Sequence, residues 1–500
     1  MEGRRERSLC FVGDIMNYSE SMEYLEELNV FGMSLGLDRI KKLLDLMGNP
    51  QKQYTTVHVT GTNGKGSVTC MVTEILQKAG IKVGRFTSPH LESYTERVVI
   101  NGDNISREKL AAALTVVRDL CDFMVGEGDE HPTQFEVLTA AAFYIFMKEQ
   151  VEYAVIEVGL GGLLDSTNVI TPAVSVITNV SFEHADKCGG TLEGIAHHKA
   201  GIIKDGVPVI TGAAGQALEI IRQTAIEHKA AIYVAGQEFG AKAVQPLGQL
   251  SIPPNLGNTG VGNMSPSMID LQIEALSALP YGRCETEGDG AKTQLVEFTA
   301  RCEQMADMDY RLGQRGLYQI FNSSIAVATA MLLAIDDLRI TRQAIKKAML
   351  SVRWPGRFEI IPQKGYELVI DGAHNPAGIT VLRESLDYYY PDQKRIFVLG
   401  ILRDKDFEGM LKLLLRPDDR VIFTTPSSER AADPVELLEY APVETKEAIG
   451  DAGKALKRGM ELAAEASKAA DGPQADTVLI CAGSLYLIGY LRHILMNEHK

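Results

Sequence analysis

The sequence has few cysteines, and none of them is placed to form a zinc site or a disulfide framework. Seven cysteines are scattered over 500 residues, their number is odd, and no C-x-x-C occurs. Structural zinc sites and disulfide-rich secreted domains need paired or closely spaced cysteines. The sequence therefore predicts reduced thiols in a cytosolic chain, at Cys10, Cys70, Cys121, Cys188, Cys284, Cys302 and Cys481.

Long apolar runs and an excess of positive charge are also missing. No run reaches the ~18 apolar residues that cross a bilayer, and the apolar stretch before Gly13 is too short for a signal peptide. Lys and Arg number 50 against 65 Asp and Glu, which gives a net charge of -15 and disfavours nucleic acid as a partner. We expect a cytoplasmic monomer that binds small molecules, with a dispensable extension at residues 1–15.

The order of apolar segments indicates an α/β fold in two parts. A strand-like "TTVHVTG", a glycine loop and a helix-like "SVTCMVTEILQKAG" are followed by short buried-strand patterns at 153–159 and 173–180. This alternation is typical of a parallel sheet wrapped by helices. After "WPGRFE" a second α/β series begins, so we predict an ATP-binding domain at 1–352 and a Rossmann-like domain at 353–500.

One stretch, 245–293, breaks this alternation. It is rich in Gly, Pro, Asn and Ser and has little periodicity. Such composition predicts a long surface excursion that is partly disordered.

The stretch "HVTGTNGKGSV" at 58–68 has the context of a phosphate-binding loop but not the usual spacing. The standard loop reads G-x-x-x-x-G-K-[ST], whereas here only two residues separate Gly61 from Gly64, and Gly66 stands between Lys65 and Ser67. Backbone N–H groups at the start of a helix attract anions, and a lysine can reach phosphate oxygens. Ser67 stands where a helix N-cap or a magnesium contact is expected. The alternative is a glycine-rich turn with an exposed lysine.

Polar residues at the predicted ends of neighbouring strands form a second group. Ser88 ends "IKVGRFTS", Glu157 lies inside an apolar strand, and His184 follows the next strand. Ligands bind at the carboxyl ends of parallel strands, and magnesium prefers oxygen ligands. For Glu157 the alternative is a carboxylate in a core salt bridge, and for Ser88 and His184 it is a structural role.

A third group follows a strand of the second series. "LVIDGAHNP" places Asp371, His374 and Asn375 directly after an apolar run. An acidic residue at such a position can accept hydrogen bonds from a ribose. The same residues could instead cap a helix locally.

Taken together and in order, these motifs resemble the folylpolyglutamate synthase/dihydrofolate synthase family, which belongs with the Mur-type ATP-dependent amide ligases. The resemblance runs from Met16 to Leu491, apart from 245–293. It rests on nine motifs: "HVTGTNGKGSV", "TSPHL", "TQFEVLTAAAF", "EVGLGGLLDSTNVI", "HKAGIIK", "WPGRFE", "DGAHNP", "LRDKD" and "GSLYLIG".

The resemblance implies a role for each matching residue. ATP and Mg²⁺ would bind together, and Lys199 would be carbamylated. The nucleotide contacts would be Asn63, Gly64, Lys65, Gly66, Ser67, Asn322, Arg357 and Asp371, and the metal ligands Ser88, Glu157, His184 and Lys199. Catalysis would involve Lys65, Lys199 and His374. The pterin side would be held by Thr133, Phe135, Glu136, Leu164, Asp165 and Ser166.

The sequence departs from the family pattern at three places. Leu163 replaces the usual arginine of "GGRLDATN", Glu183 precedes His184 where the family has aspartate, and His198 precedes Lys199 where it has glutamate. The change at 183 lengthens a carboxylate, which leaves the role of that position open.

The implied reaction uses ATP to activate a carboxylate as an acyl phosphate, which the amino group of L-glutamate then attacks. The acceptor would be a folate, or dihydropteroate in a bifunctional enzyme. A Mur-type cell-wall ligase is the alternative within enzymes. A nucleotide-switch protein is the alternative outside them, although no N-K-x-D guanine signature occurs.

Overall fold

The structure is a computed structural model that describes residues 14–32, 34–182, 188–243, 294–468 and 477–497. The excursion predicted at 245–293 and most of the extension at 1–15 lie outside these residues. None of the five described cysteines is joined to another in a disulfide. Among the described helices none combines the length and hydropathy needed to span a bilayer.

The N-terminal part is built on a sheet of eight strands in the order β4-β3-β2-β5-β1-β6-β7-β8. The six strands from β2 to β8 run parallel, and β3 and β4 extend the edge antiparallel. The central strands are apolar and β-branched, which suits burial on both faces. The strands are β1 Thr55–Thr60, β2 Val83–Phe86, β3 Val98–Ile100, β4 Asp103–Asn104, β5 Tyr153–Glu157, β6 Val174–Ile177, β7 Val209–Thr211 and β8 Ile232–Val234.

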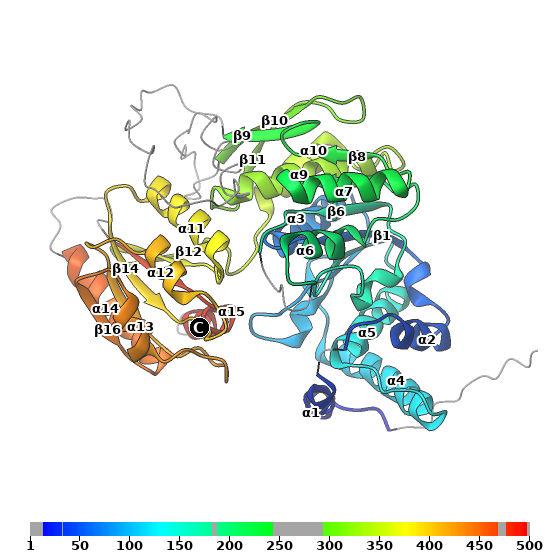
Figure 1. The fold of residues 1–500 in the computed structure, drawn as a ribbon, viewed down its shortest axis with the longest axis horizontal. Helices are drawn as coiled ribbons and strands as arrows, with labels where there is room; N and C mark the ends of the chain where they lie inside the picture. The colour runs from blue at the N-terminus through cyan, green and yellow to red at the C-terminus, as the bar shows by residue number, and fades with distance from the viewer. Residues whose placement is uncertain (1–13, 33, 183–187, 244–293, 469–476, 498–500) are drawn as a thin grey trace, which may run out of the picture.

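Helices cover both faces of this sheet and make three cores with it (Figure 1). One face carries α3 Lys65–Lys78, α9 Tyr318–Leu333 and α10 Arg342–Ser351. The other carries α1 Tyr18–Glu27, α2 Asp38–Leu46, α4 Arg107–Gly126 and α5 Gln134–Lys148 over one half, with α6 Leu192–Ala200 and α7 Gly215–Glu227 over the other. Short 3₁₀ helices occupy Leu28–Phe31, Pro50–Lys52, Tyr94–Arg97 and Ser166–Val169.

A small antiparallel sheet, which the sequence did not predict, packs into the same core as α3 and α9. Its strand order is β11-β10-β9, and Val296 of β10 pairs with Ala243 of β9. The described residues that flank segment 244–293 are therefore held side by side. The strands are β9 Phe239–Ala243, β10 Gln294–Ala300 and β11 Met308–Leu312.

The C-terminal part has its own sheet of six strands, in the order β12-β13-β17-β14-β15-β16, parallel except for β12. Helices α11 to α13 pack on one face and α14 and α15 on the other. The strands are β12 Glu359–Gln363, β13 Tyr366–Ile370, β14 Lys394–Leu399, β15 Arg420–Phe423, β16 Thr445–Ala448 and β17 Thr477–Ala482. The helices are α11 Pro376–Tyr389, α12 Phe407–Leu414, α13 Pro434–Tyr440, α14 Ala452–Lys468 and α15 Leu485–Asn497.

The two parts touch through the segment that follows β2. Arg492 of α15 donates to Glu92 at 2.8 Å and to Glu359 at 3.0 Å. Leu91 packs so closely on Gly489 that a side chain there would meet the Leu91 carbonyl oxygen. The first sheet ends before α10 and the last begins after it, which supports the division at 352, although that boundary stays a prediction.

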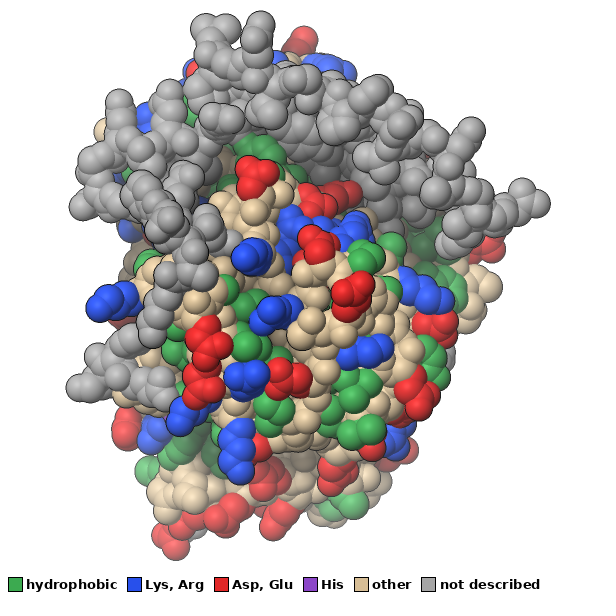
Figure 2. Space-filling model, turned by 90° about the vertical axis from the view of Figure 1, so that its left-hand side faces the viewer, with side chains coloured by type: hydrophobic (Ala, Val, Ile, Leu, Met, Phe, Trp, Pro, Cys, Tyr) green, Lys and Arg blue, Asp and Glu red, His purple; other side chains and the backbone are tan. Residues whose placement is uncertain are grey.

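On the face of the molecule shown in Figure 2, basic and acidic side chains alternate over the described surface. Hydrophobic side chains are scattered between them. The acidic side chains of the described surface are therefore spread out on this face and do not form one patch.

Candidate active site

Three loops of the large sheet meet at the carboxyl edge of its parallel strands. They follow β1, β5 and β2, which are adjacent in the sheet, and their first residues are Gly61, Val158 and Thr87. A fourth loop, after β6, supports the first. Chain segments distant in sequence are thus brought together where ligands bind in open α/β sheets.

The phosphate loop predicted at 61–67 connects β1 to α3. Asn63 is fixed by its neighbours: its N–H donates to Asn179 Oδ1 at 2.9 Å, and its carbonyl accepts from Thr178 Oγ1 at 2.7 Å. The helix N-cap is Gly64, in the left-handed region with φ of 84°. The prediction that Ser67 is the N-cap is therefore wrong. It is the third residue of α3, buried, and its Oγ accepts from Gln319 Nε2 at 3.2 Å.

Two glycines of this loop are required by close packing, and Gly64 by its backbone conformation as well. A Cβ atom at Gly64 would collide with Oδ1 of Asn322, a residue that the resemblance places near the nucleotide. A Cβ atom at Gly66 would lie 2.9 Å from Cζ2 of Trp354. The loop therefore fits between α9 and the segment that leads to the C-terminal sheet.

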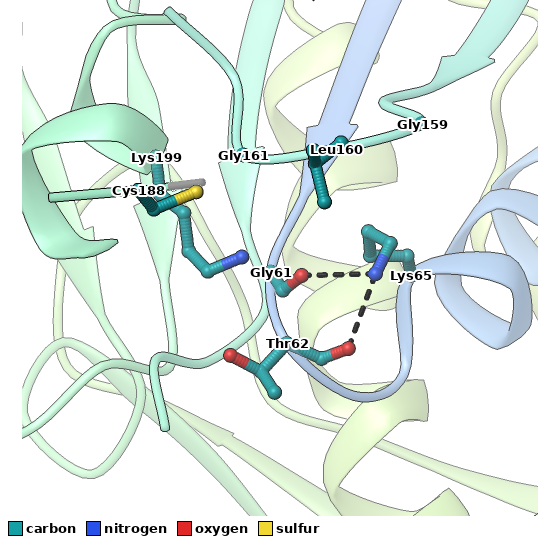
Figure 3. Close-up of a pocket in the computed structure, with 8 residues that line it drawn as sticks. All are labelled: Gly61, Thr62, Lys65, Gly159, Leu160, Gly161, Cys188 and Lys199. Carbon is teal, nitrogen blue, oxygen red and sulfur yellow. Dashed lines mark hydrogen bonds between the residues drawn. The ribbon is translucent and has the colours of Figure 1, made fainter. Parts of the chain in front are cut away.

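Lys65 and Lys199 line one small pocket with the phosphate loop (Figure 3). Lys65 Nζ donates to the carbonyl oxygens of Gly61 and Thr62 at 3.0 and 3.1 Å. Lys199, near the end of α6, is buried, and its side chain runs into the pocket toward Gly61. The other lining residues are Gly159, Leu160, Gly161 and Cys188.

Glu157, the last residue of β5, is buried and accepts a hydrogen bond from the Ser88 N–H at 3.2 Å. Burial raises the pKa of its carboxyl group to about 7, against the opposing fields of Lys65, Arg357 and Arg85. Among the described residues no basic side chain forms an ion pair with it. The predicted alternative of a core salt bridge is therefore not supported.

The predicted metal ligands are only partly described. Ser88 and Glu157 are in contact, and Lys199 lines the adjoining pocket. His184 and its neighbour Glu183 lie outside the described residues. Within the described ranges no group of three or more His, Cys, Asp or Glu side chains is arranged to hold a metal ion.

The turn after β13 reaches the phosphate loop from the C-terminal part. Asn375 Nδ2 donates to Asn63 Oδ1 at 3.1 Å, and the Asn375 side chain also caps α11. His374 Nδ1 donates to the Gly372 carbonyl at 2.7 Å. The Arg357 guanidinium lies over Gly372, where a side chain would displace it. Arg357 and His374 are thus placed beside the turn that touches the loop.

Asp371 is buried at the start of the same turn, and protein donors engage both of its oxygens. Oδ2 accepts from Tyr318 Oη at 2.7 Å and from Phe358 N–H at 2.8 Å, and Oδ1 accepts from Ala373 N–H at 2.8 Å. Burial raises the pKa of this carboxyl group. The residue that caps α11 is Asn375, so Asp371 itself is no cap. Its proposed contact with ribose stays a prediction.

The residues predicted for the pterin side also come together. Thr133 caps α5, and its N–H and Oγ1 donate to Glu136 Oε2 at 2.8 and 2.9 Å. Phe135 packs against Gly159, and Ser166 Oγ lies 2.8 Å from Thr139 Oγ1. The N-terminus of α5 therefore faces the loop that carries Leu164, Asp165 and Ser166.

A buried hydrogen-bonded chain, which sequence reasoning missed, anchors this loop to β1. His58 Nε2 lies 2.8 Å from Thr167 Oγ1, which donates to Asp165 Oδ1 at 2.5 Å, and Asp165 Oδ2 accepts from Leu160 N–H. Since the threonine proton goes to the carboxylate, His58 donates through Nε2. Burial lowers the pKa of His58 to about 3, so the ring is neutral.

Other contributors were missed because the sequence gives no sign of their partners. Arg39 pairs with Glu136 at 3.1 Å from 97 positions away. Asn375 stood in a quoted motif but was expected to act only locally. Trp354 also lies in a quoted motif, "WPGRFE", yet nothing in that motif indicates its contact with Gly66.

A phosphate-loop α/β unit followed by a second α/β unit that brings a turn onto the loop is the architecture of the Mur-type ligases. The sequence matches the Mur ligase middle domain over residues 59–250 and the Mur ligase, glutamate ligase domain over residues 356–484.

Relatives that match almost the whole chain identify the family within the Mur-type ligases. The chain is 32% identical to folylpolyglutamate synthase of Lacticaseibacillus casei over 96% of this chain and 99% of the relative. It is 29% identical to dihydrofolate synthase/folylpolyglutamate synthase of Bacillus subtilis over 95% and 98%. It superposes on folylpolyglutamate synthase of Mycobacterium tuberculosis, solved with ADP and AMPPCP, with a TM-score of 0.77, 29% identity and coverage of 96% and 99%. The chain belongs to the folylpolyglutamate synthase/dihydrofolate synthase family, and the predicted fold class is confirmed.

Proposed function

We propose that this protein is an ATP-dependent ligase that joins L-glutamate to the carboxylate of a folate, and to dihydropteroate where it acts as dihydrofolate synthase. The observation that carries the proposal is the Asn375–Asn63 hydrogen bond, which brings the C-terminal part onto the phosphate loop. Relatives that cover almost the whole chain carry both activities in their names. We further propose that the protein acts as a cytoplasmic monomer.

A divalent cation fits the residues beside the phosphate loop. Glu157 is a buried carboxylate with no basic side chain in ion-pair contact among the described residues, and the backbone N–H of Ser88 donates to it, which places the Ser88 residue beside it. A carboxylate and a hydroxyl are the oxygen ligands that magnesium prefers. Magnesium would supply positive charge to the phosphate oxygens. We propose Ser88, Glu157, His184 and a carbamylated Lys199 as the residues that hold this metal site.

The chain's own groups would then position the phosphoryl transfer. A folate carboxylate is a poor acyl donor, so its oxygen takes the γ-phosphoryl group of ATP and ADP leaves. Lys65 and the N–H groups at the start of α3 offset negative charge on the phosphates. Arg357 and His374 approach from the second part. Asn63, Gly64, Gly66, Ser67, Asn322 and Asp371 would complete the nucleotide site.

The amide then forms when the amino group of L-glutamate attacks the acyl carbon. The new C–N bond replaces the C–O bond to phosphate, which leaves as inorganic phosphate, and the amine loses a proton. Closure of the C-terminal part over the loop would keep water from the acyl phosphate.

The pterin end of the substrate would lie between the start of α5 and the loop after β5. Glu136 supports this placement: its Oε2 accepts from Arg39 and Thr133, whereas its Oε1 is buried and has no hydrogen-bond partner among the described residues. A buried acceptor without a partner is costly, and an amino-substituted ring could supply the donor. Phe135, Leu164, Asp165 and Ser166 would complete this contact.

The decisive experiment measures ADP release by the purified protein with each substrate omitted in turn. We expect turnover only when ATP, a reduced folate or dihydropteroate, and L-glutamate are all present. ATP hydrolysis that needs neither acceptor nor glutamate would indicate a nucleotide switch and overturn the proposal. Comparing dihydropteroate with tetrahydrofolate identifies the preferred acceptor.

A further inference from the structure

The only tryptophan in the chain, Trp354, lies in the segment that joins the two parts and packs on the phosphate loop. Its indole edge occupies the space that a side chain at Gly66 would need, 2.9 Å from the Cβ position. The guanidinium of Arg85, on β2, lies over the indole ring, 4.8 Å from its centre. A cation over an aromatic face is attracted to it. Trp354 is therefore held between the nucleotide-binding helix and the neighbouring strand.

The backbone on either side of Trp354 is held as well. Its N–H donates to Gln314 Oε1 at 2.8 Å, and Gln314 Nε2 donates to the carbonyls of Trp354 and Arg357. Cys70 Sγ of α3 donates to the Arg353 carbonyl at 3.6 Å. The segment is thus attached to α3 on one side of Trp354 and to the β11–α9 turn on the other.

Arg357 follows three residues later, at the point where the chain enters the C-terminal part. Its guanidinium lies over Gly372 and acts electrostatically on Glu157 and Asp371. Any shift of the segment on α3 would therefore move this guanidinium relative to the phosphate loop. Displacements of about 1 Å in positioning groups can cost about 10²-fold in rate.

We infer that Trp354 is a positioning residue: its indole, held between Gly66 and Arg85, sets the linking segment on the phosphate helix so that Arg357 meets the nucleotide. The inference rests on the proposed function, because Arg357 is assigned to the nucleotide there. It predicts that Trp354 affects the rate of the reaction with bound nucleotide more than it affects nucleotide affinity.

The first test uses the tryptophan fluorescence of wild-type protein, excited at wavelengths that tyrosine does not absorb, so that it reports on Trp354 alone. We expect titration with Mg-ADP or Mg-AMPPNP, without folate, to change the emission with a midpoint equal to the dissociation constant measured by calorimetry. An emission spectrum that stays constant at saturating nucleotide would overturn the inference.

The second test compares W354A, W354F and R85M at saturating ATP, per folded molecule. We expect W354A to lower kcat at least tenfold with less than a threefold change in KM for ATP. W354F should lower kcat less than threefold, and R85M should lower kcat by an amount between those of the two tryptophan variants. In an R357A background, adding W354A should lower kcat by less than a further threefold. Losses that multiply would show that Trp354 does not act through Arg357.

A matched control is Tyr440, a partly exposed aromatic residue of α13 that packs edge-on against Phe407 at 5.3 Å. Y440A should lower the melting temperature without changing kcat. If W354A behaves like Y440A, Trp354 only packs. If W354A does not fold, W354F, R85M and the nucleotide titration still decide. Wild-type protein without folate- and glutamate-dependent turnover would instead refute the proposed function.

Discussion

Glu157 carries a cost in the folded protein that a bound cation would remove. The carboxyl group is buried, and burial raises its pKa from 4.5 to about 7. The folded state therefore binds this proton more tightly than the unfolded state does. The tighter binding of this proton stabilises the folded state by about 3 kcal/mol below pH 4.5. This stabilisation is lost as the pH rises through 7.

Glu157→Gln should accordingly abolish most turnover without lowering stability. In magnesium-free buffer at pH 8 the variant should be at least as stable as wild type, and the difference should vanish toward pH 4.5. Denaturant unfolding across this pH range, with turnover assays on the same samples, provides the measurement.

Glu384 of α11 is the matched control, because burial also raises its carboxyl pKa to about 7. Glu384→Gln should change the pH dependence of stability in the same direction and leave turnover intact. A strong loss of stability in Glu157→Gln, with normal activity of the folded fraction, would show that Glu157 is a structural residue.

We expect the side chain of Lys199 to be covalently modified to a carbamate. A lysine amine that adds carbon dioxide loses a proton and becomes a carbamate, whose two oxygens suit a hard cation, whereas an ammonium cannot ligate one. Lys199→Ala should be nearly inactive and partly rescued by acetate or formate. Lys65→Ala should be inactive without rescue, because Lys65 supplies positive charge.

Carbon-13 bicarbonate tests the same modification directly. A carbamate signal that is present in wild type and absent from Lys199→Ala is expected. An unmodified amine in metal-bound enzyme supplied with bicarbonate would disprove the carbamate.

At the scale of elements, the loop after β5 depends on one threonine hydroxyl. Thr167→Val removes the group that connects His58 to Asp165 and leaves His58 Nε2 without its partner. An unpaired buried donor costs about 1–3 kcal/mol. We expect that loss of stability together with a higher KM for folate and an unchanged KM for ATP.

The control for this variant is Thr329→Val on α9, a buried threonine whose hydroxyl donates to Ile325 at 2.8 Å. It should leave both KM values unchanged. Equal KM values for folate in Thr167→Val and wild type would show that the buried chain does not position the loop.

The elements predicted from the sequence are those with a strong local pattern. β1, β5 and β6 are continuous apolar runs between turn residues, and α3 follows a glycine loop. In the sheet of β9 to β11, β9 was missed because it pairs with β10 across segment 244–293, and such pairing leaves no local trace. The partners of Arg39 and Trp354 were missed for the same reason. The β10–β11 pair, whose strands are close in sequence, was not recognised from its pattern. The carbamylation of Lys199 was expected from the family resemblance, and the ribose contact of Asp371 from its position after a strand; both stay predictions.

At the scale of the whole molecule, segment 244–293 begins and ends on paired strands. Because Ala243 lies opposite Val296, a short turn can replace the segment without moving β9 or β10. Replacing residues 250–290 by a short Gly and Asn turn should leave kcat unchanged and raise stability by about 1 kcal/mol, since loop-closure entropy grows only logarithmically. A folded variant with much weaker folate affinity would show that the segment covers the substrate.

The packing of Gly64 on Asn322 and of Gly66 on Trp354 limits how the sequence of this loop can vary in evolution. The glycines are dictated by side chains that lie more than 250 positions further along the chain, and one of them belongs to the segment entering the other half of the protein. Natural variants that enlarge position 66 should therefore carry a smaller residue at 354, whereas position 64 should stay glycine because its φ of 84° also requires it. The same loop sequence, transplanted into another α/β protein that lacks those partners, should not adopt the conformation it has here.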